Sequence, residues 1–347
     1  MFRQLITKNF ILLRLATAAI IIVLALSLPL WANPGITFRA SLVLIYILFA
    51  ASFNQLFNYT GLISFGQAAY FATGAYVAAL YVKSGASLSG GIILAVIAGG
   101  LVAAFLGYIS LRASGIYFAI LTLALGQIVY QVIFKWPATG GENGLADIPR
   151  GTINLGLAQI SLASPVSYYY LILICVSLGL FILWAVTHSN FGRILMSIKQ
   201  NHVRASFLGI NVRLYQLISF AIAGSIAGLA GAVYGPLTGV LMPEMATWIY
   251  STTPILLTLM GGANFFWGPA TGAVIFGIFE YLTRAMTGMS SLIMGLLLLT
   301  VVLAFPGGIL GLVTSWLIGK PSIKKSSRNE GSAAASKLMP GGDVINE

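Results

Sequence analysis

Long apolar segments recur along this chain and exclude an ordinary water-soluble fold. About 20 predominantly apolar residues in a helix cross the hydrocarbon core of a bilayer, and the helix keeps its own backbone N–H and C=O groups paired. Of the 347 residues, 59% are hydrophobic and only 7% are charged, whereas about 25% of the residues of a soluble domain are charged. The sequence therefore predicts an all-α polytopic membrane protein.

Ten apolar segments are expected to be helical. The segment at 15–30 follows three basic residues but lacks the small-x-small pattern of a signal-peptide cleavage site, so we interpret it as a first spanning helix. The segment at 249–262 is short and contains Pro254, so it is expected to be broken or re-entrant. The ten segments are 15–30, 40–58, 66–82, 88–110, 114–134, 166–187, 214–235, 249–262, 269–286 and 291–305.

Lys and Arg residues are unevenly distributed between the two sides of this arrangement. If the N-terminus is cytoplasmic, the outer side receives only Arg39, Lys83, Lys135, Arg150 and Arg284, and the rest of the 18 basic residues lie inside. By the positive-inside rule, both termini are expected in the cytoplasm. The net charge of +11 does not indicate nucleic-acid binding, because the basic residues are scattered and are not clustered with aromatic residues.

The expected domain organisation has two parts. Residues 1–319 form the transmembrane domain. Residues 320–347 are rich in Ser, Ala, Gly and mixed charge, and such a composition cannot bury enough apolar surface to fold. We therefore expect a disordered cytoplasmic tail at 320–347.

The stretch at 188–213 is the only long polar interruption of the central region, and it has basic residues but no acidic residue. Drawn as one helix, it has a polar stripe and an adjacent apolar face, with Gly192 and Gly209 at the ends, where positive φ is often needed. It is either a surface that binds a cytoplasmic partner or a basic loop that only fixes orientation. The basic residues are Arg193, Lys199, Arg204 and Arg213; the stripe is Arg193, Ser197, Gln200 and Arg204; the apolar face is Ile194, Ile198, Ala205 and Leu208.

The long outer connection at 135–165 contains a glycine-rich turn at 139–145. Gly140, Gly141 and Gly144 lie within five residues and surround Asn143, which predicts a tight turn with exposed backbone. The turn is a docking loop for an external partner, the lip of a pore, or an ordinary solvated turn.

Two glycine-punctuated stretches, 59–80 and 262–277, are candidates for a pathway through the membrane. We interpret them as five spans apart and running in opposite directions, as two inverted-topology, pseudo-symmetric halves require. The alternative is close packing of helices on glycine. If the helices are broken here, their freed backbone groups line a polar path. The candidate pathway residues are Ser64, Gly66, Gln67, Tyr117, Thr122 and Gln127.

Ionisable groups are nearly absent from the expected spans. Glu280 and Arg284 are the main exception, an i, i+4 pair near the end of a span. This scarcity argues against a proton-coupled secondary transporter and against a membrane enzyme, and it offers no catalytic, cofactor or metal site. The chain also lacks the Gly-x4-Gly-Lys-Ser/Thr loop, so any nucleotide-driven work belongs to another polypeptide.

Six motifs in order resemble the permease subunits of binding-protein-dependent ABC importers for branched-chain amino acids. The resemblance covers roughly residues 40–312, and the substrate it implies is a branched-chain or other apolar amino acid. Related permeases for urea and other amides share much of the pattern and remain an alternative, as does, less favoured, an inverted-repeat secondary transporter. The motifs are Tyr59–Tyr70 with Gly74–Tyr76, Leu111–Leu123, Thr139–Leu145, Ser189–Arg193 leading to Leu208–Asn211, Gly261–Gly262 with Trp267–Pro269, and Phe305–Leu312.

The resemblance also implies the partners of the chain. They are a second homologous permease subunit, two cytoplasmic ABC ATPases and a soluble substrate-binding protein, all at a bacterial or archaeal plasma membrane. Residues 192–213, with Gly192, Arg193, Arg204 and Gly209, resemble the element that docks in the ATPase. We expect specificity to reside in the binding protein, because an apolar pathway has little means of rejecting a similar small amino acid. A structural or assembly subunit is a further alternative.

Overall fold

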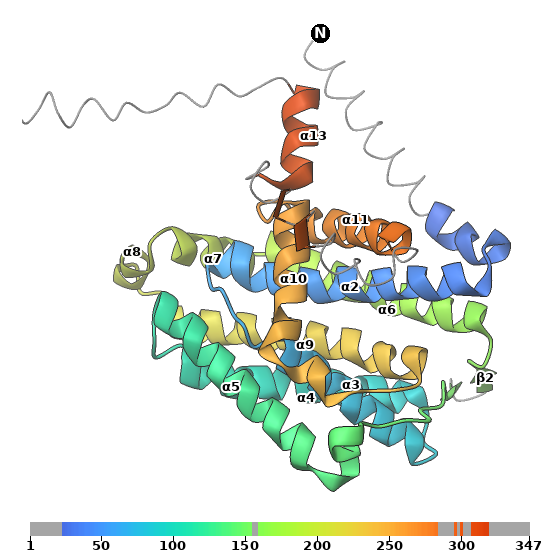
Figure 1. The fold of residues 1–347 in the computed structure, drawn as a ribbon. Coiled ribbons are helices and arrows are strands. Elements are labelled where there is room, and N and C mark those ends of the chain that lie inside the picture. Colours follow the sequence, from blue (N-terminus) through green and yellow to red (C-terminus); the bar gives the residue numbers. More distant parts are fainter. Residues whose placement is uncertain (1–22, 155–158, 284–294, 297–298, 301–306, 319–347) are drawn as a thin grey trace, which may run out of the picture.

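The computed structural model describes residues 23–154, 159–283, 295–296, 299–300 and 307–318 (Figure 1). Within this part the chain is almost entirely helical. The elements are α2 (Pro34–Thr60), α3 (Gln67–Lys83), α4 (Leu88–Ser110), α5 (Ile116–Lys135), η1 (Pro137–Thr139), η2 (Gly141–Asn143), β1 (Thr152–Asn154), β2 (Gln159–Ser161), α6 (Pro165–His188), α7 (Asn190–Gln200), α8 (His202–Phe207), α9 (Val212–Thr238), η3 (Pro243–Ala246), α10 (Trp248–Gly261), α11 (Gly268–Thr283) and α13 (Gly308–Ile318).

Helices α2 to α6, α9, α10 and α11 lie where apolar segments were expected, with ends that differ by a few residues. Five of the described helices, α2, α4, α5, α6 and α9, are long and apolar enough to cross a membrane. Helices α3, α10 and α11 have only 17, 14 and 16 residues. Half of the expected segment at 15–30, most of that at 291–305, and the tail after residue 319 lie outside the described residues.

The long helices lie side by side in Figure 1, and α10 lies across them in this view. Helices α7 and α8 are at one end of the bundle, and the β1–β2 hairpin is at the other. The hairpin was not expected; Ile153 pairs with Ile160 at the centre of its antiparallel register. It lies in the polar connection between α5 and α6, so the helical character of the bundle is unaffected.

Helix α9 is the centre of the bundle and packs on α2, α3 and α4. A Cβ at Gly228 would lie 2.6 Å from the carbonyl oxygen of Ala95 on α4, and one at Gly74 of α3 would collide with the backbone of Gly228. Small residues let helix backbones approach this closely, and van der Waals packing at such contacts drives helix association in lipid. Close packing therefore explains Gly74, which lies inside α3 and does not interrupt it.

The expected opposite directions of 59–80 and 262–277 are wrong. The stretch 59–80 begins near α7, since Lys199 packs against Gly61, and Lys83 at the end of α3 donates to the backbone oxygen of Ala146. The start of α11 follows Phe266, which contacts His188 at the end of α6, and Tyr281 lies 5.3 Å from Arg39 at the other end of the bundle. Both stretches therefore run from the α7 end of the bundle toward its other end.

Candidate functional site

The polar stretch between α6 and α9 folds into two short helices. The single helix expected over this stretch is wrong: Asn201 is extended, with φ −162° and ψ 101°, and separates α7 from α8. Its side-chain oxygen accepts a hydrogen bond from Arg204 N at 2.9 Å and caps α8. The sequence signal for this break was Asn201 itself, because Asn is a preferred N-cap residue.

The two glycines of this stretch have different roles. Gly209 has φ +82° and follows the end of α8, as expected. Gly192 lies within the first turn of α7 and is absent from the positive-φ positions, so the expectation for it is wrong. A Cβ at Gly192 would collide with the backbone of Thr187, so this glycine allows α7 to turn tightly against the end of α6.

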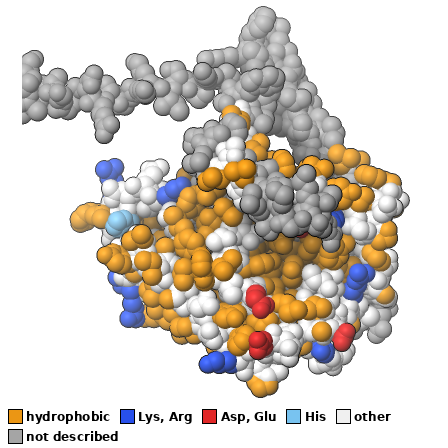
Figure 2. All heavy atoms as spheres, in the orientation of Figure 1, with side chains coloured by type: hydrophobic (Ala, Val, Ile, Leu, Met, Phe, Trp, Pro, Cys, Tyr) orange, Lys and Arg blue, Asp and Glu red, His pale blue; other side chains and the backbone are white. Residues whose placement is uncertain are grey.

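The outer surface of α7 and α8 is both basic and apolar. Arg193 and Arg204 are exposed, whereas Leu195 and Ile198 are buried beneath them. At the far end, the side chains of Val203, Phe207 and Leu208 are 50%, 88% and 77% exposed. Figure 2 shows hydrophobic side chains projecting at this end of the molecule. Leu208 belongs to the apolar face that the sequence indicates, whereas Phe207 lies outside that face. We call Val203, Phe207 and Leu208 the apolar tip.

Lys199 of α7 reaches the end of α2. Its Nζ donates to the backbone oxygen of Asn58 at 2.7 Å and contacts the Asn58 Oδ1 at 3.3 Å. Partial burial lowers the pKa of Lys199 below its usual value, because desolvation disfavours the charged form. The contact joins α7 to a residue 141 positions away in the chain.

The break between α2 and α3 brings together several of the predicted pathway residues. Gly61 ends α2 with φ +74°, and Gly66 precedes α3. Phe65 N donates to the Thr122 Oγ1 at 3.1 Å, and Gly66 N donates to the Ser64 Oγ at 3.2 Å.

The first turn of α3 is held by side chains of other helices. The Gln67 Nε2 donates to the Ser52 Oγ at 3.1 Å, and Ala68 N donates to the Ser251 Oγ of α10 at 2.9 Å. All of these side chains are at most 1% exposed. Because free N–H groups at a helix start need partners, Ser251 satisfies one that α3 itself leaves unpaired. Ser52 and Ser251 were missed because serine within an apolar helix gives no specific signal.

Tyr117 and Gln127 of α5 do not belong to this buried cluster. Tyr117 is 74% exposed, and Gln127 lines a groove of about 670 Å³ along α5 with Gln131 and Lys135. These three polar side chains follow one helix face at i, i+4 and i+8. Helix α5 thus has a narrow buried side, at Phe118, Thr122 and Gly126, and a broad exposed one.

The glycine-rich loop at 139–145 is a tight turn, as its sequence indicates. Gly140 and Gly144 have φ of +84° and +70°, and a Cβ at Gly140 would overlap the carbonyl of Gly144. Leu145 pairs with Leu241 in an antiparallel bridge, with N–O distances of 2.9 and 2.8 Å, so the loop is fastened to the segment after α9. Gly141 belongs to the same turn, and Asn143 is exposed.

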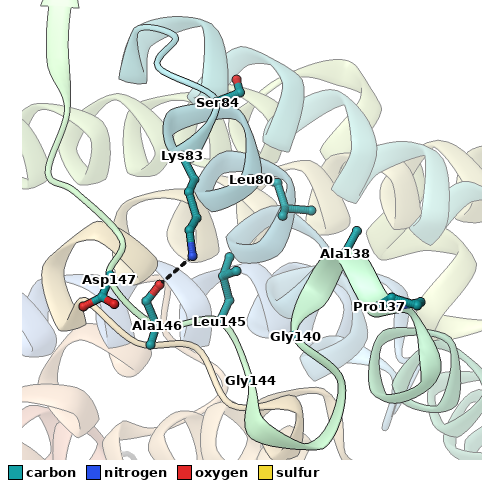
Figure 3. A pocket seen from close by; sticks show the side chains of 10 residues that line it. All are labelled: Leu80, Lys83, Ser84, Pro137, Ala138, Gly140, Gly144, Leu145, Ala146 and Asp147. Atoms are coloured by element: carbon teal, nitrogen blue, oxygen red, sulfur yellow. Dashed lines mark hydrogen bonds between the residues drawn. The ribbon is translucent and has the colours of Figure 1, made fainter.

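A hollow of about 490 Å³ opens beside this loop (Figure 3). In Figure 3, Lys83 extends from α3 toward the loop, and its Nζ donates to the backbone oxygen of Ala146 at 3.0 Å. Within the part of the chain that the structure describes, no three His, Cys, Asp or Glu side chains gather where a metal ion could be held.

Comparison with known proteins decides the family. A family model described as "Branched-chain amino acid transport system / permease component" matches residues 35–303. The chain belongs to this family. The permease is 27% identical over 317 residues to the LivM permease protein of the high-affinity branched-chain amino acid transport system of Escherichia coli K12, covering 84% of this chain and 73% of LivM.

Two further relatives are more distant. The LivH permease protein of the same E. coli system is 24% identical over 283 residues, covering 77% of this chain and 91% of LivH. The galactose/methyl galactoside import permease protein MglC of E. coli is 24% identical over 168 residues, or 47% of each chain. No solved structure matches the chain significantly. The permease is thus a multi-pass membrane subunit of a branched-chain amino acid transporter of the ABC importer class, and a urea or amide permease is not favoured.

Proposed function

We propose that the permease forms, with a second homologous permease subunit, the transmembrane path of an importer driven by two cytoplasmic ATPase subunits. Its cargo is a branched-chain or other apolar amino acid, which a soluble external binding protein delivers. The family match and the names of LivM and LivH support this class of cargo. The observation that carries the proposal is the α7–α8 element between α6 and α9, which exposes an apolar tip and two arginines.

The apolar tip is the part of this element best suited to bind an ATPase. Phe207 and Leu208 expose most of their surface at the end of the bundle, outside the expected hydrocarbon region. Large side chains that enter a partner's pocket dominate the binding energy of protein interfaces. Arg193 of α7 and Arg204 of α8 are exposed on the same element and would steer an acidic groove toward it, since complementary charge raises the association rate.

Charge supports the proposed orientation, with α7, α8 and both termini in the cytoplasm. The residues from 188 to 213 contain no acid, whereas Glu142, Asp147 and Glu244 lie in the connections that follow α5 and α9. The outer loop bearing Gly140, Gly141, Asn143 and Gly144 then faces the binding protein. Its bridge to Leu241 makes it a fixed docking feature that needs little ordering on binding.

The exposed face of α5 is suited to form the interface with the second permease subunit. Gln131 is exposed on this face, and Gln127 one turn before it is half-buried, with a side-chain oxygen that has no hydrogen-bond partner among the described residues. Amides facing hydrocarbon lack hydrogen-bond partners, so such a face is better covered by protein or by a water-filled path. Tyr117 and Gln127 would line this path, and the buried cluster of Ser64, Gly66, Gln67 and Thr122 would hold the break that lets α3 move.

The inverted repeat is better assigned to α2–α3 and α9–α10 than to the stretches chosen from sequence. Helices α2 and α9 each have 27 residues, and each ends in a left-handed glycine, Gly61 with φ +74° and Gly239 with φ +75°. Each is followed by a short helix, and the two short helices meet where Ala68 N bonds to Ser251. Because α2 and α9 run in opposite directions through the bundle, the two units have inverted topology.

Charge reversal of the proposed docking surface tests this function. We expect Arg193→Glu with Arg204→Glu to weaken ATPase association about tenfold or more, near 1.4 kcal/mol, and to reduce uptake accordingly. Insertion and thermal stability should be retained, because both side chains are exposed. Arg112→Glu, at the α4–α5 turn of the same end, is the matched control. Normal transport by the double variant would refute the proposal.

A further inference from the structure

Besides its neighbour α8, helix α7 contacts three helices, and two of these contacts are local in sequence whereas one is not. It meets α6 through Gly192 and α9 through the stacking of Phe191 on Tyr215, whose ring centroids are 5.5 Å apart. Both of those helices adjoin the α7–α8 element in sequence. The hydrogen bonds of Lys199 to Asn58 reach instead into the first half of the chain, and they are the only side-chain hydrogen bonds between α7–α8 and that half within the described residues.

Lys199 contacts α2 at the C-terminal end of that helix. Asn58 lies in the last turn of α2, where carbonyl groups have no partner within the helix. A lysine ammonium there satisfies a carbonyl and interacts favourably with the negative end of the helix dipole. The stem of Lys199 also packs on the helix-ending glycine, since a Cβ at Gly61 would lie 3.2 Å from its Cγ.

The end of α2 leads directly into the buried break. Within a few residues of Gly61, Phe65 N bonds to Thr122 of α5 and Ala68 N bonds to Ser251 of α10. A displacement of the last turn of α2 would therefore also shift α5 and α10. Tightly packed elements of this kind move as units, because interfaces of packed side chains do not deform continuously.

We infer that Lys199 is a positioning residue that ties the last turn of α2 to α7, so that movement of α7 is passed to the α2–α3 break. The inference rests on the proposed function, because it requires an ATPase to move α7. Lys199 itself does not contact the cargo. Removing the ammonium group of Lys199 should leave the ATPase bound, but ATP hydrolysis should then drive less transport.

The test uses the complete complex of two permeases, ATPases and binding protein in liposomes. Lys199→Met keeps the apolar stem but removes the donor and its charge, and Lys199→Arg restores both. We expect Lys199→Met to bind ATPase as tightly as wild type, to hydrolyse ATP, and to transport about fivefold or more fewer amino acids per ATP, a typical size for coupling between sites. Lys199→Arg should recover part of this loss, and the control Arg112→Met should show none.

Two outcomes separate the inference from the proposed function. If Lys199→Met transports as many amino acids per ATP as wild type, the inference is refuted and the docking proposal stands. If wild-type permease does not bind ATPase through α7–α8, the proposed function itself fails.

A distance measurement does not depend on the stability of Lys199→Met. Spin labels at Met196→Cys and Ile63→Cys, in a Cys175→Ser background, report the separation between α7 and the segment that directly follows α2, and we expect it to stay within about 2 Å between nucleotide-free and ATP-bound complexes. A larger change would show that α7 and the end of α2 move independently, and would refute the inference.

Discussion

Phe207 offers the sharpest measurement on the proposed docking surface. Its side chain is 88% exposed at the end of α8, so nearly all of its apolar surface is available for burial by a partner. Fully burying a phenylalanine side chain contributes about 1.5 to 3 kcal/mol. Phe207→Ala removes most of this contribution, and a loss of about 2 kcal/mol corresponds to about a 30-fold weaker Kd.

The assay is equilibrium binding of purified ATPase to the permease pair in nanodiscs, read by thermophoresis, with uptake measured in parallel. The melting temperature should be unchanged, because the exposed ring of Phe207 contributes little to the folded permease. Phe105→Ala is the matched control: Phe105 is 65% exposed on the membrane helix α4, where an ATPase cannot reach it. We expect the control to bind ATPase as wild type does.

The reasoning is refuted if Phe207→Ala binds ATPase within twofold of wild type at unchanged stability. Such a result would mean that the ring remains exposed in the complex. A loss of ATPase binding of equal size in Phe105→Ala would refute it as well. Such a loss would show that removing any exposed apolar side chain weakens binding, so that Phe207 would have no particular role.

Two further predictions concern packing and substrate. Gly228→Val should lower the melting temperature strongly, because a Cβ there would lie 2.6 Å from the carbonyl oxygen of Ala95. The control Gly35→Val should change it little, because a Cβ at Gly35 would have no atom within 4 Å. Equal effects of the two variants would contradict the role of Gly228 in packing. Calorimetry on the permease without partners should detect no micromolar binding of leucine, isoleucine or valine, because charged groups to hold a zwitterion are scarce; a clear isotherm would show that the membrane subunit selects its substrate.

The sequence predicted the helical segments well because their signal is local. A run of apolar residues between polar connections marks a membrane helix whatever surrounds it, which is why α4 begins and ends where expected. The glycine-rich turn at 139–145 was also predictable, because positive φ at Gly140 and Gly144 is a local demand of the backbone. The basic, acid-free character of 188–213 likewise needed only the residue order.

The roles of individual glycines were not readable from the sequence. Gly61 ends a helix, whereas Gly74 lies within one and packs on Gly228. Both uses require a missing Cβ, so the two give the same pattern in a sequence. Only the position of α9 beside α3 distinguishes them.

By itself the sequence determined that this chain is a multi-pass helical membrane protein, that its central polar loop is basic, and which family it resembles. Those properties follow from composition and from motifs that are read along the chain. The tertiary structure decided which long-range neighbours meet: Lys199 with Asn58, Ala68 with Ser251, and Leu145 with Leu241. It also decided that α3 and α11 run in the same direction and that Phe207 is exposed. The physical reason is that such contacts depend on how helices far apart in the chain pack on α9. Glycine and alanine are common throughout membrane helices, so the residue order does not show which of their faces pack together.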